Sequence, residues 1–167
     1  MKRFLALLLL LLAIPAAQAA QAVYSHHYSN TNNTTTAAPT GVGTTGAVMG
    51  LGGSITPLYT GTVLFMISGD ITNGTGADGA KVQIYYGTGS ASGNGTACAS
   101  AGTTRNAVGQ AVQQTPVVAA ATKIPFHVHA IVTGLTVGTA YWFDACLTAI
   151  TGGTASIGDV TASAAEL

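Results

Sequence analysis

Apolar and polar residues alternate along several short stretches of the chain, and glycine-rich turns separate them. In such a stretch, alternate side chains of an extended strand face a core while the others face solvent. No helical period occurs after residue 20, which favours two packed antiparallel sheets. The stretches with a strand pattern are residues 62–68, which are apolar on both faces, 81–86, 126–132, 141–147 and 156–164.

The first 19 residues have the pattern of a cleavable secretory signal peptide. Met1-Lys2-Arg3 precedes an apolar run from Phe4 to Ile14, and Ala17-Gln18-Ala19 provides the small-residue cleavage pattern. The alternative is an uncleaved N-terminal anchor, although the apolar run from Phe4 to Ile14 is short for a membrane span. No later apolar stretch is long enough to span a membrane. We therefore expect a secreted or extracytoplasmic protein with no membrane span after cleavage.

The remainder divides into an arm and a domain. Residues 20–46 are rich in Thr, Asn and Gly and carry little apolar area, so we predict a flexible arm. Residues 47–167 form the predicted β-sandwich domain, with a short first strand at 47–51. A long loop of Gly, Ser, Ala and Thr at 87–104 interrupts it. Residues 105–122 fit neither a strand nor a helix period well, although their β-branched content favours a strand.

Charge excludes one class of partner. Loss of Lys2 and Arg3 with the signal leaves three basic residues against five acidic ones, a net charge of −2. Three dispersed cations cannot neutralise the phosphates of a nucleic acid, so we expect no nucleic-acid partner. The charged residues of the mature chain are Lys81, Arg105, Lys123, Asp70, Asp78, Asp144, Asp159 and Glu166.

Two cysteines, Cys98 and Cys146, remain after the signal. In an oxidising compartment a disulfide between them is the expected state, and two unpaired thiols are the alternative. Their spacing and the absence of other Cys ligands do not match a zinc site.

Candidate chemistry is sparse, and we assign no catalytic residue, cofactor or metal from the sequence. Asp144 lies inside an apolar strand, where a hydrogen-bonded structural role is favoured over a catalytic one. His127 and His129 point the same way on one strand and most simply form a polar or interface face. Alternatively, three copies of the pair could surround an iron-type ion on a three-fold axis. His26 and His27 are expected to be ordinary solvated histidines.

Two resemblances add expectations. Residues 134–141 resemble the tyrosine corner of fibronectin type III domains, with Val137 where proline is usual. From about residue 37 to 167 the chain is similar to a module of uncharacterised phage and prophage proteins, found in C-terminal parts of tail-fibre or virion-surface proteins. The segments that carry this similarity, in order, are residues 38–41, 48–52, 55–57, 68–71, 83–89, 124–126, 141–144 and 164–167.

These resemblances imply a fold and a role. We predict an all-β, antiparallel, jelly-roll-like sandwich, with a fibronectin type III or immunoglobulin-like sandwich as the alternative. The implied role is a non-enzymatic structural or adhesive module, a homotrimer that contacts a receptor or glycan, with the virion as one possible location. A monomeric secreted or periplasmic binding domain and a secreted hydrolase are the alternatives. Sugar platforms, if present, would be Tyr59, Tyr85 or Trp142.

Overall fold

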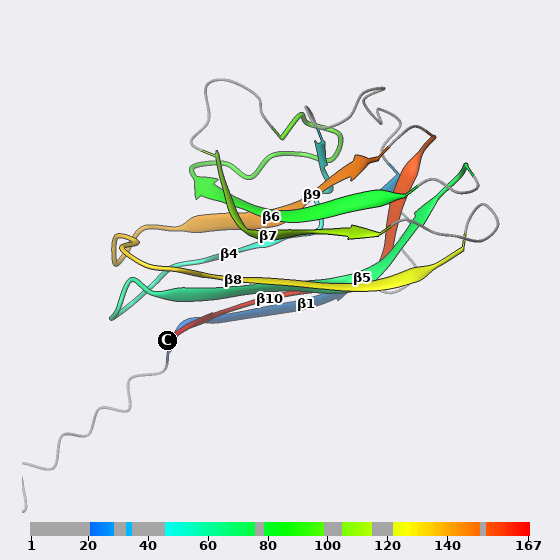
Figure 1. Ribbon diagram of the computed structural model, residues 1–167. Helices are drawn as coiled ribbons and strands as arrows, with labels where there is room; N and C mark the ends of the chain where they lie inside the picture. The colour runs from blue at the N-terminus through cyan, green and yellow to red at the C-terminus, as the bar shows by residue number, and fades with distance from the viewer. Residues whose placement is uncertain are drawn as a thin grey trace, which may run out of the picture.

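The computed structural model shows two antiparallel sheets packed face to face (Figure 1). It describes residues 21–28, 33–34, 46–75, 79–98, 105–114, 122–150 and 153–167. Within these ranges no helix is long and apolar enough to cross a membrane. The strands are β1 (Val23–Tyr28), β2 (Asn33–Thr34), β3 (Ala47–Val48), β4 (Gly53–Ile55), β5 (Val63–Asn73), β6 (Ala80–Thr88), β7 (Arg105–Gln114), β8 (Ile124–Val132), β9 (Tyr141–Ala149) and β10 (Ala155–Glu166).

The strand order is that of a jelly roll. Sheet A runs β1-β10-β5-β8, with β2 also paired to β10, and sheet B runs β3-β9-β6-β7, with β4 also paired to β9. Because β1 and β2 pair with successive parts of β10, and β3 and β4 with successive parts of β9, each pair fills one strand position. Eight positions in two Greek keys confirm the jelly-roll-like prediction, and the seven-stranded fibronectin alternative is wrong.

The predicted arm is wrong for Val23–Tyr28, which form the edge strand β1. This strand pairs with β10 from Val23 opposite Ala165 to Tyr28 opposite Val160. Its inward side chain Tyr24 packs edge-on against Phe143, with 5.5 Å between the ring centroids. Amino-acid composition did not predict this strand, because the strand is held by backbone hydrogen bonds to the edge of β10 and these do not depend on residue type. Of the rest of the arm, Asn33–Thr34 form β2. Residues 20, 29–32 and 35–45 lie outside the described residues, as does the predicted signal peptide at 1–19.

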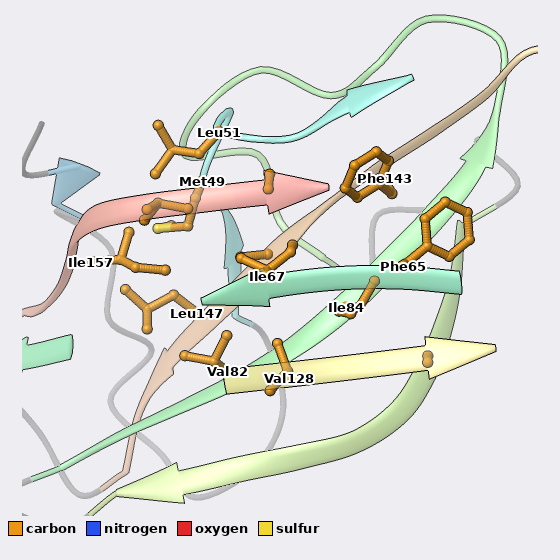
Figure 2. Close-up of a cluster of buried hydrophobic side chains, with 14 of the residues drawn as sticks. Met49, Leu51, Phe65, Ile67, Val82, Ile84, Val128, Phe143, Leu147 and Ile157 are labelled. Carbon is orange, nitrogen blue, oxygen red and sulfur yellow. The ribbon is translucent and has the colours of Figure 1, made fainter. Parts of the chain in front are cut away.

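The core fills the space between the two sheets (Figure 2). Alternation in β5 and β8 buries every second side chain, as the sequence pattern predicts. In β9, by contrast, nearly every residue is buried. The outward side of this strand is covered as well, so residues on both of its faces are buried, the polar Asp144 among them. The largest fully buried apolar side chains are Phe65, Phe143, Met49, Ile67, Ile71, Ile84, Leu147 and Ile157.

The corner before β9 has the hydrogen bond of a tyrosine corner. The backbone N–H of Thr136 donates to the hydroxyl oxygen of Tyr141 at 2.9 Å. The same corner is held to the β4–β5 loop, because the N–H of Leu135 donates to the carbonyl of Gly61 at 2.9 Å. This local resemblance to fibronectin type III domains therefore holds in geometry although the fold is a jelly roll.

Candidate functional site

Asp144 lies on the outward side of β9 and is almost fully buried, with 4% of its surface exposed. Its Oδ2 accepts a hydrogen bond from the N–H of Gly50 at 2.6 Å. Its Oδ1 accepts from the N–H groups of Leu51, at 3.2 Å, and Ala145, at 2.7 Å. Gly50 and Leu51 form the break between β3 and β4, where strand pairing is interrupted. The carboxylate thus takes the place of the missing strand partner.

Glycine is required at this break. Gly50 has a φ of 68°, a left-handed conformation that other residues resist. A Cβ atom on Gly52 would collide with the carbonyl oxygen of Phe143. The Gly-Leu-Gly sequence therefore allows the backbone to approach β9 closely enough for its N–H groups to reach Asp144.

Burial raises the pKa of Asp144 to about 6, although the N–H groups of Ala145, Leu51, Gly50 and Gly52 act in the opposite direction. Loss of hydration penalises the charged carboxylate more than these donors stabilise it. The side chain consequently changes charge close to neutral pH.

A cleft of about 310 Å³ opens beside Asp144. The hydroxyl oxygen of Ser92 is buried at this cleft without a hydrogen-bond partner in the described part of the chain. Asp144 and Ser92 are therefore not joined as a nucleophile and base would be, which favours the structural role of Asp144. The residues that line the cleft are Tyr24, Gly50, Gly52, Gly53, Ser54, Ala91, Ser92, Phe143 and Asp144.

Glu166, at the end of β10, is a second buried carboxylate, with 1% of its surface exposed. Its Oε1 accepts from the N–H groups of Tyr59, at 2.7 Å, and Thr60, at 2.6 Å, and its Oε2 from that of Leu58 at 2.9 Å. Burial acts to raise the pKa of Glu166, but these backbone donors outweigh it and lower the pKa to about 2. Sequence reasoning missed this role, because nothing local marks the glutamate as a partner of a loop 106–108 positions away.

The two carboxylates give opposite pH dependences of stability. The folded pKa of Asp144 lies above its ordinary value of 3.8, so stability falls as pH rises from about 4 to about 6. A difference of about two pKa units corresponds to about 3 kcal/mol. The folded pKa of Glu166 lies below its ordinary value of 4.5, so stability falls as pH drops from 4.5 towards 2. We expect the free energy of unfolding, measured in urea, to be greatest near pH 4.

Two isosteric variants separate these contributions. Asp144→Asn should remove the loss of stability between pH 4 and 6, and Glu166→Gln should remove the loss below pH 4.5. A wild-type protein whose stability rises steadily from pH 4 to pH 7 would contradict the role given to Asp144.

The predicted disulfide between Cys98 and Cys146 is present, with a Cα–Cα distance of 6.1 Å. It fastens the loop after β6 onto the outward side of sheet B, where Val48 and Tyr85 pack around it. The loop also forms backbone hydrogen bonds with β3: the N–H of Val48 donates to Thr96 at 2.8 Å, and that of Gly95 donates to Val48 at 2.9 Å. The described part of the loop therefore covers Val48 of β3 and Cys146 of β9 on the outer side of this sheet.

The predicted histidine pair lies on the opposite side of the molecule. His127 and His129 are exposed on the outward side of β8, with 5.5 Å between their ring centroids. His27 on β1 is also exposed, and its Nδ1 lies 2.9 Å from the hydroxyl oxygen of Thr161. His26 is exposed beside it. The described residues contain no group of three or more His, Cys, Asp or Glu side chains that could hold a metal. A metal shared between three copies of His127 and His129 stays a prediction.

The three aromatic side chains named as sugar platforms differ in accessibility. Trp142 is 2% exposed, and its indole N–H donates to the carbonyl of Thr88 at 3.2 Å. Tyr85 packs against the disulfide. Tyr59 is 56% exposed, on the loop that Glu166 holds. Of the three, Tyr59 alone is freely presented to a ligand.

No protein-family model matches the chain, and neither does any curated protein. Among solved structures, the chain is similar to one from infectious bursal disease virus, Gt strain, with 12% identity and a TM-score of 0.39; the match covers 87% of this chain and 31% of the viral one. It is also similar to Eiger TNF from S. frugiperda, with 9% identity and a TM-score of 0.41, covering 87% and 92% of the two chains. The fold assignment itself rests on the strand order described above.

Proposed function

We propose that the chain is an exported, non-enzymatic structural or adhesive module of the phage-fibre or virion-surface type. The observation that supports this proposal is that both buried carboxylates hold backbone segments in place and neither lies in a catalytic arrangement. Asp144 and Glu166 each bind several backbone N–H groups and so fix a strand break and a loop. Buried polar groups that are engaged in this way rigidify a scaffold. The disulfide is compatible with an extracellular or secreted location.

The module is proposed to work as a homotrimer. Closed rotational symmetry lets a small domain present several identical surfaces to one receptor or glycan, which raises avidity. Light scattering coupled to size exclusion, on the signal-free protein at micromolar concentration and pH 7, should give three times the chain mass. A single-chain mass would overturn the homotrimer and favour the monomeric secreted or periplasmic binding domain.

The β4–β5 loop supports receptor or glycan contact in either state. Leu58 and Tyr59 are 46% and 56% exposed, yet their backbone N–H groups are held by Glu166. A contact surface that is ordered before binding loses less conformational entropy when a partner docks. This loop is therefore the proposed contact point of the module.

A further inference from the structure

Two histidines and a methionine lie together on the outward side of sheet A, where β5 and β8 run side by side (Figure 1). His127 and His129 are exposed on β8. Met66 on β5 lies directly opposite His129 in the pairing register, so the two side chains point to the same side of the sheet. Such opposed residues have Cβ atoms about 4.5–5.5 Å apart, and a diagonal neighbour such as His127 is still within reach of a long side chain. The thioether sulfur of Met66 can therefore reach the space beside both imidazole rings.

The two imidazole rings have a spacing that one metal ion can bridge. Their centroids are 5.5 Å apart. An ion about 2 Å from a ring nitrogen lies about 3.2 Å from the centroid of that ring, so two rings that share an ion have centroids at most about 6.4 Å apart. The observed separation corresponds to an angle of about 120° between the two nitrogens at the ion. Because both rings are exposed, each can turn about its side-chain torsions to aim a nitrogen at the ion.

The outward position of Met66 makes its sulfur available to an ion. Of the three methionines in the sequence, Met1 belongs to the predicted signal peptide and Met49 is fully buried between the sheets. Met66 is only partly buried, whereas its neighbours on β5, Phe65 and Ile67, face the core. Methionine usually serves to fill gaps in a core, and this one does not.

These three ligands favour a soft metal ion. Imidazole nitrogens suit zinc, copper, iron and nickel ions, whereas a thioether sulfur selects monovalent copper. Hard ions such as Mg²⁺ and Ca²⁺ prefer oxygen ligands. The one carboxylate on β5 and β8 is that of Asp70, and it lies 3.7 Å from the Nζ of Lys123. Three ligands at angles of about 120° suit Cu(I) better than Zn(II), which completes a tetrahedron of four.

We infer that His127, His129 and Met66 bind one Cu(I) ion on the outward side of sheet A. The site is complete within a single chain, so it goes beyond the proposed function and does not depend on the homotrimer. It also differs from the shared three-fold site considered from the sequence, which would bind one ion for every three chains and would not use the methionine.

Competition with a coloured Cu(I) chelator tests the site. The signal-free protein is titrated without oxygen, with ascorbate to keep copper reduced and bicinchoninate as the competitor. We expect one Cu(I) ion per chain. Loss even of an outer partner of a metal ligand costs about 10–100-fold in affinity, so His127→Ala and His129→Ala should each weaken binding at least about tenfold.

The contribution of the thioether is measured separately. Met66→Leu keeps the size of the side chain but removes the sulfur. It should weaken Cu(I) binding about tenfold while leaving the affinity for Ni(II), which relies on the two imidazoles, unchanged. If Met66→Leu binds Cu(I) as tightly as the wild type, the methionine is not a ligand and the site as proposed is wrong.

The matched control is the double variant His26→Ala/His27→Ala. These histidines are also exposed, but as successive residues of β1 they point to opposite sides of the strand and cannot share an ion. This variant should bind Cu(I) as the wild type does, and thermal unfolding should show that all variants are folded. A wild type that leaves Cu(I) with the chelator, or that binds Zn(II) more tightly than Cu(I), would overturn the copper site. One ion per three chains would overturn its single-chain form.

Discussion

Replacing Asp144 with alanine is expected to lower the free energy of unfolding by about 3 kcal/mol or more at pH 7. The substitution leaves the N–H groups of Gly50, Leu51 and Ala145 without the acceptor that they have in the native protein. Each buried donor left unsatisfied costs about 1–3 kcal/mol. Alanine also removes a buried charge whose desolvation is unfavourable, which is why we expect a value near the lower end of the sum.

Urea unfolding monitored by Trp142 fluorescence measures this loss, and Asp144→Asn is the matched control. Asparagine keeps the shape and one acceptor oxygen, so it should lose about half as much stability as alanine. If Asp144→Ala and Asp144→Asn both cost less than about 1 kcal/mol, the carboxylate does not hold the strand break. Since small domains are stable by only about 5–15 kcal/mol, a loss of the expected size is a large fraction of the total.

Removal of the disulfide is expected to lower stability by about 4 kcal/mol. The bridge closes a loop with a sequence separation of 48 residues, and the chain-entropy model gives this value for a loop of that length. The double variant Cys98→Ser/Cys146→Ser should show the loss in equilibrium urea unfolding without reductant.

The wild type treated with reductant and then alkylated provides the comparison for this variant. Equal losses in the two samples would assign the effect to the bond rather than to the serine hydroxyls. Unchanged stability in both would show that hydrogen bonds between the loop and β3 hold the loop without help from the bridge. Local protection from hydrogen exchange at Val48 and Gly95 would then distinguish a fastened loop from a loosened one.

The regular strands were predictable because their apolar periods reflect burial directly. Residues 81–86 and 126–132 alternate in the sequence and lie within β6 and β8 with the expected faces inward. The disulfide was predictable from the number of cysteines together with the expectation of an oxidising compartment. The strand β1 was not, because it contributes few core side chains and is held mainly by backbone pairing to β10, more than 130 residues away in the sequence.

The hydrogen-bonded structural role of Asp144 was predicted, but its backbone partners and the role of Glu166 were beyond the reach of sequence patterns for a related reason. Each carboxylate binds backbone N–H groups, and a backbone donor has no residue-type signature. The Gly50-Leu51-Gly52 sequence was one visible signal, since paired glycines often mark a close backbone approach. Trp142, which was a candidate surface aromatic, is buried because the outward side of β9 is covered by chain segments whose position depends on tertiary structure.

The pairing of β1 with β10 also determines when the domain can fold. β10 lies between β1 and β5, so sheet A lacks a central strand until residues 155–166 are available. A chain that emerges from the ribosome N-terminus first can therefore complete neither the sheet nor the Glu166-bound loop before its last strand has been made. The jelly roll can therefore close only after its last strand has been made, an order that is compatible with the export proposed above.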